Sequence, residues 1–176
     1  MTNTHPPVLA PICLVLGALL GLAGTFVSSP SLRGLAWGAD GVALVIAGAL
    51  LIVHHFRQGH DIVAAGFVVF AVGQTLVLSG AAMSLEASAP SFAAGAALWA
   101  ASLFLVSTPR VFPLPVRLLG LIAGALFAAT SLQVFAGRAL TPLSKPLPFF
   151  AYPFLVFTMF GWAWSCLRPT VAAPRN

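Results

Sequence analysis

Charged side chains are scarce in this sequence. The 176 residues include eight Lys or Arg and three Asp or Glu, so only 6% are charged, where a soluble domain has roughly 25%. With 60% hydrophobic residues and a mean hydropathy of +1.02, the chain has too few polar side chains to cover a globule in water. These shortages exclude a water-soluble domain and indicate a protein whose solvent is the lipid bilayer.

Residues and motifs that carry chemistry are also few. The two cysteines provide neither a disulfide framework nor a metal knuckle. Asparagine occurs only at positions 3 and 176, which excludes the paired Asn-Pro-Ala turns of aquaporin-like channels. The sequence contains no phosphate-binding loop, kinase motif or dinucleotide fingerprint. We therefore expect a protein that is not an enzyme and that carries no cofactor.

Long apolar runs account for most of the chain. Crossing a hydrocarbon core of about 30 Å takes about 20 apolar residues in a helix. Six runs approach or meet this length, at residues 8–27, 35–53, 62–83, 92–107, 114–135 and 147–166. The sequence therefore predicts an all-α, polytopic integral membrane bundle of six transmembrane helices, which forms a single transmembrane domain over residues 1–176. Pro153 lies inside the sixth run and predicts a kink or a later helix start.

The distribution of basic residues predicts the orientation of this bundle. Lys and Arg in short loops stay preferentially in the cytoplasm. Alternating the loops places five basic residues on the side of the two termini and three on the other side: Arg57, Arg110, Arg117, Arg168 and Arg175 against Arg33, Arg138 and Lys145. We expect both termini to be cytoplasmic in a bacterial-type inner membrane. Because the net charge of +5 is dispersed, its expected partner is the lipid bilayer and not nucleic acid.

Small residues recur at helical spacing in several of the runs. Such residues allow close helix approach in lipid, where the hydrophobic effect gives helices little reason to associate. The pairs and stripe are Gly17 and Gly21, Gly120 and Gly124, and Gly66, Gly73 and Gly80. The stripe makes the third run our candidate for the centre of the bundle. The same faces could also bind a second copy of the chain or a membrane-protein partner.

Asp40 is an acidic residue inside the second run, about one turn from its expected start. An ionisable residue in a membrane span is costly and by default faces a partner or a water-filled cavity. Arg33, Arg138 or Lys145 could pair with it from the same side. The alternative is a residue of the first helical turn that complements the helix dipole.

Gln74 and Thr75 are polar residues near the middle of the third run. With Asp40 they would line a polar path through the bundle if all three faced its interior. The alternative is that each makes a hydrogen bond to a neighbouring helix.

Three histidines and an aspartate, His54, His55, His60 and Asp61, lie between the second and third runs. Imidazole is a good ligand for zinc, copper, iron or nickel, so these four are the candidate metal ligands. The same residues also suit two helix ends: histidine stabilises a helix C-terminus, Gly59 supplies a left-handed cap, and Asp61 caps the next helix. We favour this second interpretation and predict no metal.

Three functions fit these observations. The first is a non-enzymatic accessory or assembly subunit, because small-residue faces are plentiful. The alternative is an oligomeric permease or channel for a small uncharged or weakly polar solute, with Asp40, Gln74 and Thr75 along the route. The third is a metal-binding membrane protein that uses the histidines of the inner loop.

Overall fold

The computed structural model describes residues 8–168, and every regular element in that range is a helix. The helices are α1 (Leu9–Phe26), α2 (Pro30–Arg57), α3 (Asp61–Ser79), α4 (Leu85–Ser107), α5 (Leu114–Phe135) and α6 (Ala151–Leu167). Five of them are long and apolar enough to cross a membrane, and α6 is apolar but shorter, with 17 residues. The predicted all-α, multi-pass bundle of six helices is confirmed.

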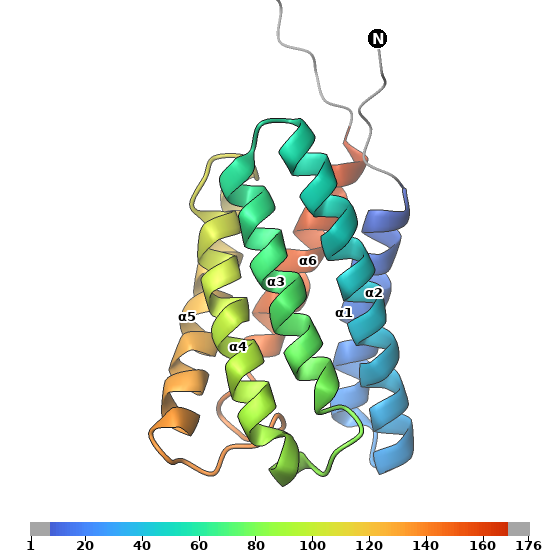
Figure 1. The fold of residues 1–176 in the computed structure, drawn as a ribbon, viewed down its shortest axis with the longest axis vertical. Helices are drawn as coiled ribbons and strands as arrows, with labels where there is room; N and C mark the ends of the chain where they lie inside the picture. The colour runs from blue at the N-terminus through green and yellow to red at the C-terminus, as the bar shows by residue number, and fades with distance from the viewer. Residues whose placement is uncertain (1–7, 169–176) are drawn as a thin grey trace, which may run out of the picture.

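The six helices form a closed ring. Each helix packs against its neighbours in sequence, and α1 also packs against α6. Figure 1 shows α2, α3 and α4 in one layer and α1, α6 and α5 in the other. We call the end where α1 begins and α6 ends the terminal end, and the opposite end the cavity end.

None of the six helices within residues 8–168 occupies the centre of this ring, so the expectation that the third run lies there is wrong. The neighbours of α3 are α2 and α4, and its Val68 and Val72 are 45% and 49% exposed on the outside. Large aromatic side chains fill the centre instead. The rings of Phe67 and Trp162 lie 5.0 Å apart, and those of Trp99 and Phe127 lie 5.3 Å apart.

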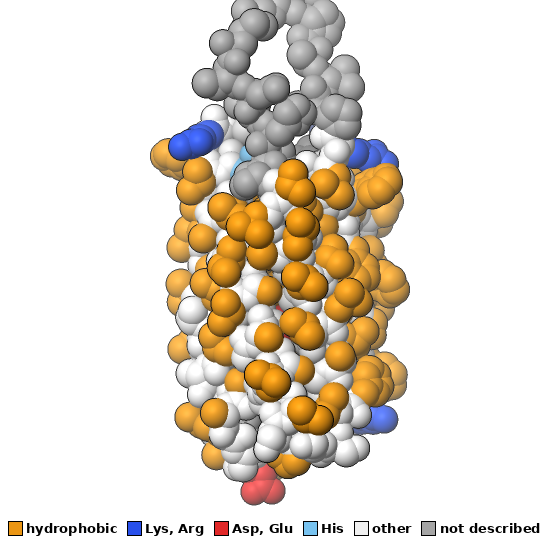
Figure 2. All heavy atoms as spheres, turned by 90° about the vertical axis from the view of Figure 1, so that its right-hand side faces the viewer, with side chains coloured by type: hydrophobic (Ala, Val, Ile, Leu, Met, Phe, Trp, Pro, Cys, Tyr) orange, Lys and Arg blue, Asp and Glu red, His pale blue; other side chains and the backbone are white. Residues whose placement is uncertain are grey.

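The outer surface is apolar along its length. Figure 2 shows hydrophobic side chains over the middle of one face, with Lys and Arg near the two ends. Exposed large side chains such as Ile46, Val53 and Ile122 occur on several helices. Since a lipid-facing surface has no need of polar groups, this distribution agrees with a membrane environment.

Several helices extend beyond the apolar runs that predicted them. α2 begins at Pro30 and ends at Arg57, instead of residues 35 and 53. α4 begins at Leu85, instead of residue 92, because the Ser84 hydroxyl accepts a hydrogen bond from the amide of Ala87 at 3.3 Å and caps the helix. Polar interfacial residues are therefore helical as well. Hydropathy alone omits them.

Two of the runs shorten in the structure. α3 ends at Ser79, with Gly80 as its C-cap, instead of reaching residue 83. α6 begins at Ala151, which places Pro153 in its first turn and confirms the later start that this proline predicted. Proline is tolerated in a first turn because the missing amide would have no intrahelical partner there.

The closest approach of α3 and α4 occurs at a pair of glycines. A Cβ atom on Gly95 would lie 2.7 Å from the carbonyl oxygen of Gly73, and one on Gly73 would lie 3.0 Å from the carbonyl oxygen of Gly95. These distances leave no room for a side chain between the two backbones. The predicted role of Gly73 in close helix packing is confirmed.

Gly95→Ala should therefore destabilise the bundle by about 1 to 3 kcal/mol, because the added methyl group forces α3 and α4 apart. Gly38→Ala on α2 is the matched control, since a Cβ there meets nothing within 4 Å. It should leave stability unchanged or slightly higher, because alanine favours helix. Thermal unfolding of both purified variants in the same detergent measures the difference, and equal unfolding temperatures would contradict the close approach.

Candidate functional site

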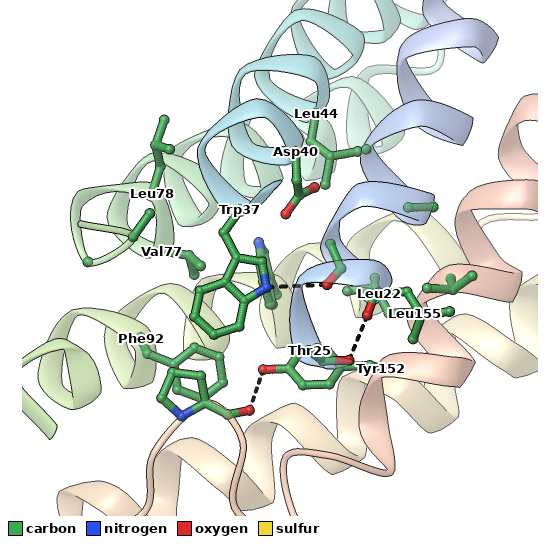
Figure 3. Close-up of a pocket in the computed structure, with 18 of the residues that line it drawn as sticks. Leu22, Thr25, Trp37, Asp40, Leu44, Val77, Leu78, Phe92, Tyr152 and Leu155 are labelled. Carbon is green, nitrogen blue, oxygen red and sulfur yellow. Dashed lines mark hydrogen bonds between the residues drawn. The ribbon is translucent and has the colours of Figure 1, made fainter. Parts of the chain in front are cut away.

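A cavity of about 70 Å³ lies inside the helix ring, in the half nearer the cavity end. Its walls come from α1, α2, α4 and α6 together with the C-terminal ends of α3 and the connection before α6. Figure 3 shows Asp40, Trp37 and Tyr152 around this space. The polar and aromatic side chains that line it are Thr25, Trp37, Asp40, Ser88, Phe92, Trp99 and Tyr152.

Asp40 reaches this cavity because it lies on the buried face of α2. Asp40, Leu44, Ala47, Leu51 and His55 are buried residues at intervals of three and four, the spacing that places side chains on one face of a helix. Because α2 begins at Pro30, Asp40 lies roughly 15 Å along the helix axis. The aspartate is therefore deeper than the single turn expected, and only 9% of it is exposed.

Glycines of α1 make room for the carboxyl group. A Cβ atom on Gly21 would lie 3.0 Å from Asp40 Oδ2, and one on Gly17 would lie 3.3 Å from Asp40 Oδ1. The Trp37 indole donates a hydrogen bond to the Gly21 carbonyl at 3.3 Å, which fixes the ring beside the carboxyl group. The glycine pair of α1 therefore packs against side chains of α2, a helix of the same chain.

No expected cation pairs with Asp40. Arg33 donates to two carbonyls at the end of α1 over 3.1–3.2 Å, Arg138 donates to a glutamine of α5 at 3.1 Å, and the Lys145 ammonium lies 4.6 Å from the centre of a phenylalanine ring. None of the three candidates forms the possible ion pair, and the alternative role in the first helical turn is wrong as well, because Asp40 is the eleventh residue of α2. Asp40 Oδ1 is buried and has no hydrogen-bond partner among the described residues.

The hydroxyl groups of the cavity lining already donate hydrogen bonds to backbone carbonyls. Tyr152 donates to the carbonyl of residue 142 at 2.8 Å, Thr25 to that of residue 22 at 2.6 Å, and Ser88 to that of residue 85 at 2.9 Å. The indole nitrogen of Trp99 is the exception, because it is buried without a partner. The cavity therefore presents mostly hydrogen-bond acceptors, with the Asp40 carboxyl as its strongest.

Gln74 and Thr75 point in different directions. Gln74 is 1% exposed, and its side-chain oxygen is buried without a hydrogen-bond partner among the described residues. Thr75 is exposed on the outside of α3 and donates to the carbonyl of Val72 at 2.7 Å. Consecutive helical residues lie about 100° apart around the axis, and this step turns Thr75 to the outside. The expectation that Thr75 lines an internal path is wrong.

The histidines gather at the terminal end. His55 is 4% exposed and stacks on Phe67 with 5.5 Å between ring centres, while the His54 and His60 rings lie 5.1 and 5.8 Å from it. Within residues 8–168, no three or more His, Cys, Asp or Glu side chains are arranged to hold a metal ion. The ring stack on Phe67 gives His55 a packing role.

The predicted helix ends around these histidines are confirmed at one position and wrong at another. Gly59 has a φ of +75°, the left-handed conformation expected of a cap. Asp61 is the first residue of α3 and not its cap; that position belongs to His60, and no side-chain cap hydrogen bond forms. The acidic group therefore acts only through the helix dipole.

The aromatic part of the site was missed by the sequence analysis. Trp37, Trp99 and Tyr152 belong to three different helices, and no spacing along the chain connects them. The residue type alone does not distinguish an aromatic ring that packs against lipid from one that lines a cavity. Only the closure of the helix ring brings these three together.

Similarity to known proteins gives no guide to this site. No family model matches the chain, and no curated protein or solved structure is significantly similar to it. The function must therefore be inferred from the chemistry of the cavity.

Asp40→Leu, a substitution of nearly equal shape, should stabilise the protein by about 1 to 3 kcal/mol, because it removes a buried acceptor without a partner. The control Glu86→Leu changes an exposed acid and should alter stability by less than about 0.5 kcal/mol. Thermal unfolding in detergent compares them. A large loss of stability in Asp40→Leu would mean that the carboxyl group has a structural partner in the folded protein.

Proposed function

We propose that this protein is a small membrane permease, and that the Asp40 cavity is its solute-binding site. The observation that supports the proposal is a carboxyl group at membrane depth, without a cation, on the wall of a cavity. Such groups are expensive in a membrane and characteristically belong to substrate or ion pathways. A cavity of about 70 Å³ suits a solute of a few non-hydrogen atoms, since drug-sized ligands occupy roughly 300 to 1,000 Å³.

A carrier is a better description than a channel. Beyond the cavity, toward the terminal end, the interior is filled by side chains such as Phe67, Phe70 and Trp162, which are fully buried. A solute in the cavity therefore meets a packed aromatic core and not a continuous polar path. Crossing the bundle would require the helices to rearrange, as in alternating access.

The first hypothesis of the sequence analysis, an accessory subunit, loses its supporting feature. Gly17 and Gly21 pack against α2, Gly73 packs against α4, and Gly124 packs against Leu103 of α4. These small-residue faces already contact helices of the same chain. The metal-binding alternative likewise has no convergent ligand set within residues 8–168.

We further propose an inner-membrane location with the terminal end in the cytoplasm. The loops and helix ends at that end contain Arg57, Arg110, Arg117 and Arg168, and those at the cavity end contain Arg33, Arg138 and Lys145. This excess of basic residues supports the orientation through the preference of Lys and Arg for the cytoplasm. The cavity would then be nearer the outer face.

The permease proposal predicts solute flux. Proteoliposomes that contain the wild-type protein should re-swell at least tenfold faster than protein-free vesicles after an osmotic step with glycerol, urea or ethanolamine, as light scattering records. Asp40→Leu should remove the increase, because it removes the only charged group of the described cavity lining. Gly38→Ala should retain it. Equal re-swelling with and without wild-type protein for all three solutes would reject the permease.

The orientation can be tested by reporter fusions in a bacterial host. Fluorescent protein fused after residue 176 should fluoresce, and alkaline phosphatase at the same position should be inactive, because the latter folds only outside the cytoplasm. A reporter inserted in the α3–α4 connection should behave in the opposite way. The reversed pattern would place the cavity on the cytoplasmic side.

A further inference from the structure

We infer that the solute of the Asp40 cavity is a small organic cation, of the alkylammonium class. This inference rests on the permease proposal, since it specifies the ligand of the same site. It depends on three features of the cavity: its charge, the direction of its hydrogen bonds and its aromatic walls.

The acidic group of the cavity has no cationic partner within the described chain. Asp40 provides the only carboxyl group of the described lining, and its Oδ1 atom is buried without a partner. The basic residues of the cavity end make contacts elsewhere, as with Arg33 at the end of α1. A buried carboxylate needs a positive partner or a hydrogen-bond donor. A cationic solute would supply both.

The hydrogen bonds of the lining select against an anion. Tyr152, Thr25 and Ser88 donate to backbone carbonyls and so turn only oxygen lone pairs toward a ligand. Trp99 alone has a free donor in the described lining. An ammonium group, which has only donors, matches this set of acceptors. A carboxylate or phosphate would lie next to the acidic Asp40 and could accept a hydrogen bond only from the Trp99 indole.

The aromatic walls favour an organic cation over a metal ion. Trp37, Phe92, Trp99 and Tyr152 line the cavity, and the face of an aromatic ring attracts a cation, with tryptophan the best. Calcium and magnesium instead bind largely through carboxylate and carbonyl oxygens, and beside its hydroxyl groups this lining has a single carboxyl group. The apolar Leu44 and Met159 complete the walls and suit the carbon atoms of an alkylammonium ion.

Binding to the purified full-length protein in detergent tests this inference. The probes are methylammonium, n-propylammonium and tetramethylammonium chloride, with 1-butanol and tert-butanol as uncharged molecules of similar shape and sodium chloride as a metal cation. Titration calorimetry and tryptophan fluorescence report binding. We expect at least one ammonium ion to bind tenfold or more tightly than either alcohol and than sodium.

Four variants locate the binding determinants. Asp40→Asn should weaken binding of the ammonium ion at least tenfold. Glu86→Gln alters an acid outside the cavity and should leave the affinity for the ammonium ion unchanged. Tyr152→Phe keeps the ring but loses one acceptor oxygen, so it should weaken binding less than Tyr152→Leu, which loses both and should bind roughly threefold to tenfold more weakly than wild type. Size-exclusion profiles and unfolding temperatures establish that each variant is folded.

The outcomes separate this inference from the permease proposal. Binding of an alcohol as tight as that of every ammonium ion, without an effect of Asp40→Asn, would overturn the cation and leave an uncharged solute for the permease. Sodium binding as tight as the best ammonium ion would overturn the organic class. If no probe binds and no solute crosses proteoliposomes, the inference and the permease proposal both fail.

Discussion

The carboxyl group of Asp40 is the feature to which the cavity half of the bundle is adapted. Removing a carboxylate from water costs several kcal/mol unless a partner compensates, and no arginine or lysine of the described chain provides one here. α1 has Gly17 and Gly21 where the carboxyl group lies, so the two helices can approach without displacing it. The cavity gives it space on the other side. Asp40 is thus accommodated by shape, and its electrostatic partner is left to be supplied from outside.

The interior changes character along its length, and this change produces the cavity. Toward the terminal end, rings such as Phe67, Phe70 and Trp162 fill the space that six helices enclose. At the level of Asp40, α1 contributes Gly17, Ala18 and Gly21 instead, and side chains of this size cannot fill the same width. A cavity remains at this level, between the small residues of α1 and the rings of Trp37, Trp99 and Tyr152. Helix packing in lipid depends on such size complementarity, because apolar burial between helices gains little over contact with lipid.

Two of the eight unpartnered buried side-chain atoms of the described chain line the cavity, and the other six lie on His55, His60, Gln74, Ser102 and Ser107. Native proteins satisfy most buried polar atoms, so each exception calls for an explanation. Asp40 Oδ1 and Trp99 Nε1 are the two that belong to the cavity lining. A binding site explains these exceptions together, since groups that lack partners in the empty protein would gain them when a ligand enters. The stability lost at such a site is the usual cost of function.

The amino-acid composition was sufficient to determine the solvent, the helical class and the approximate spans, because transfer of a helix into lipid depends on the sum of its side chains and on little else. The spacing of Asp40, Leu44 and Leu51 places them on one face of α2, but it does not identify the helix that this face contacts. Which faces meet was decided by the tertiary structure. The ring has no central helix, Thr75 lies outside, and Trp37, Trp99 and Tyr152 converge from three helices. These features depend on how six apolar helices fit together, and in lipid that choice is made by the shapes of glycines and aromatic rings in contact, which no pattern along a single helix records.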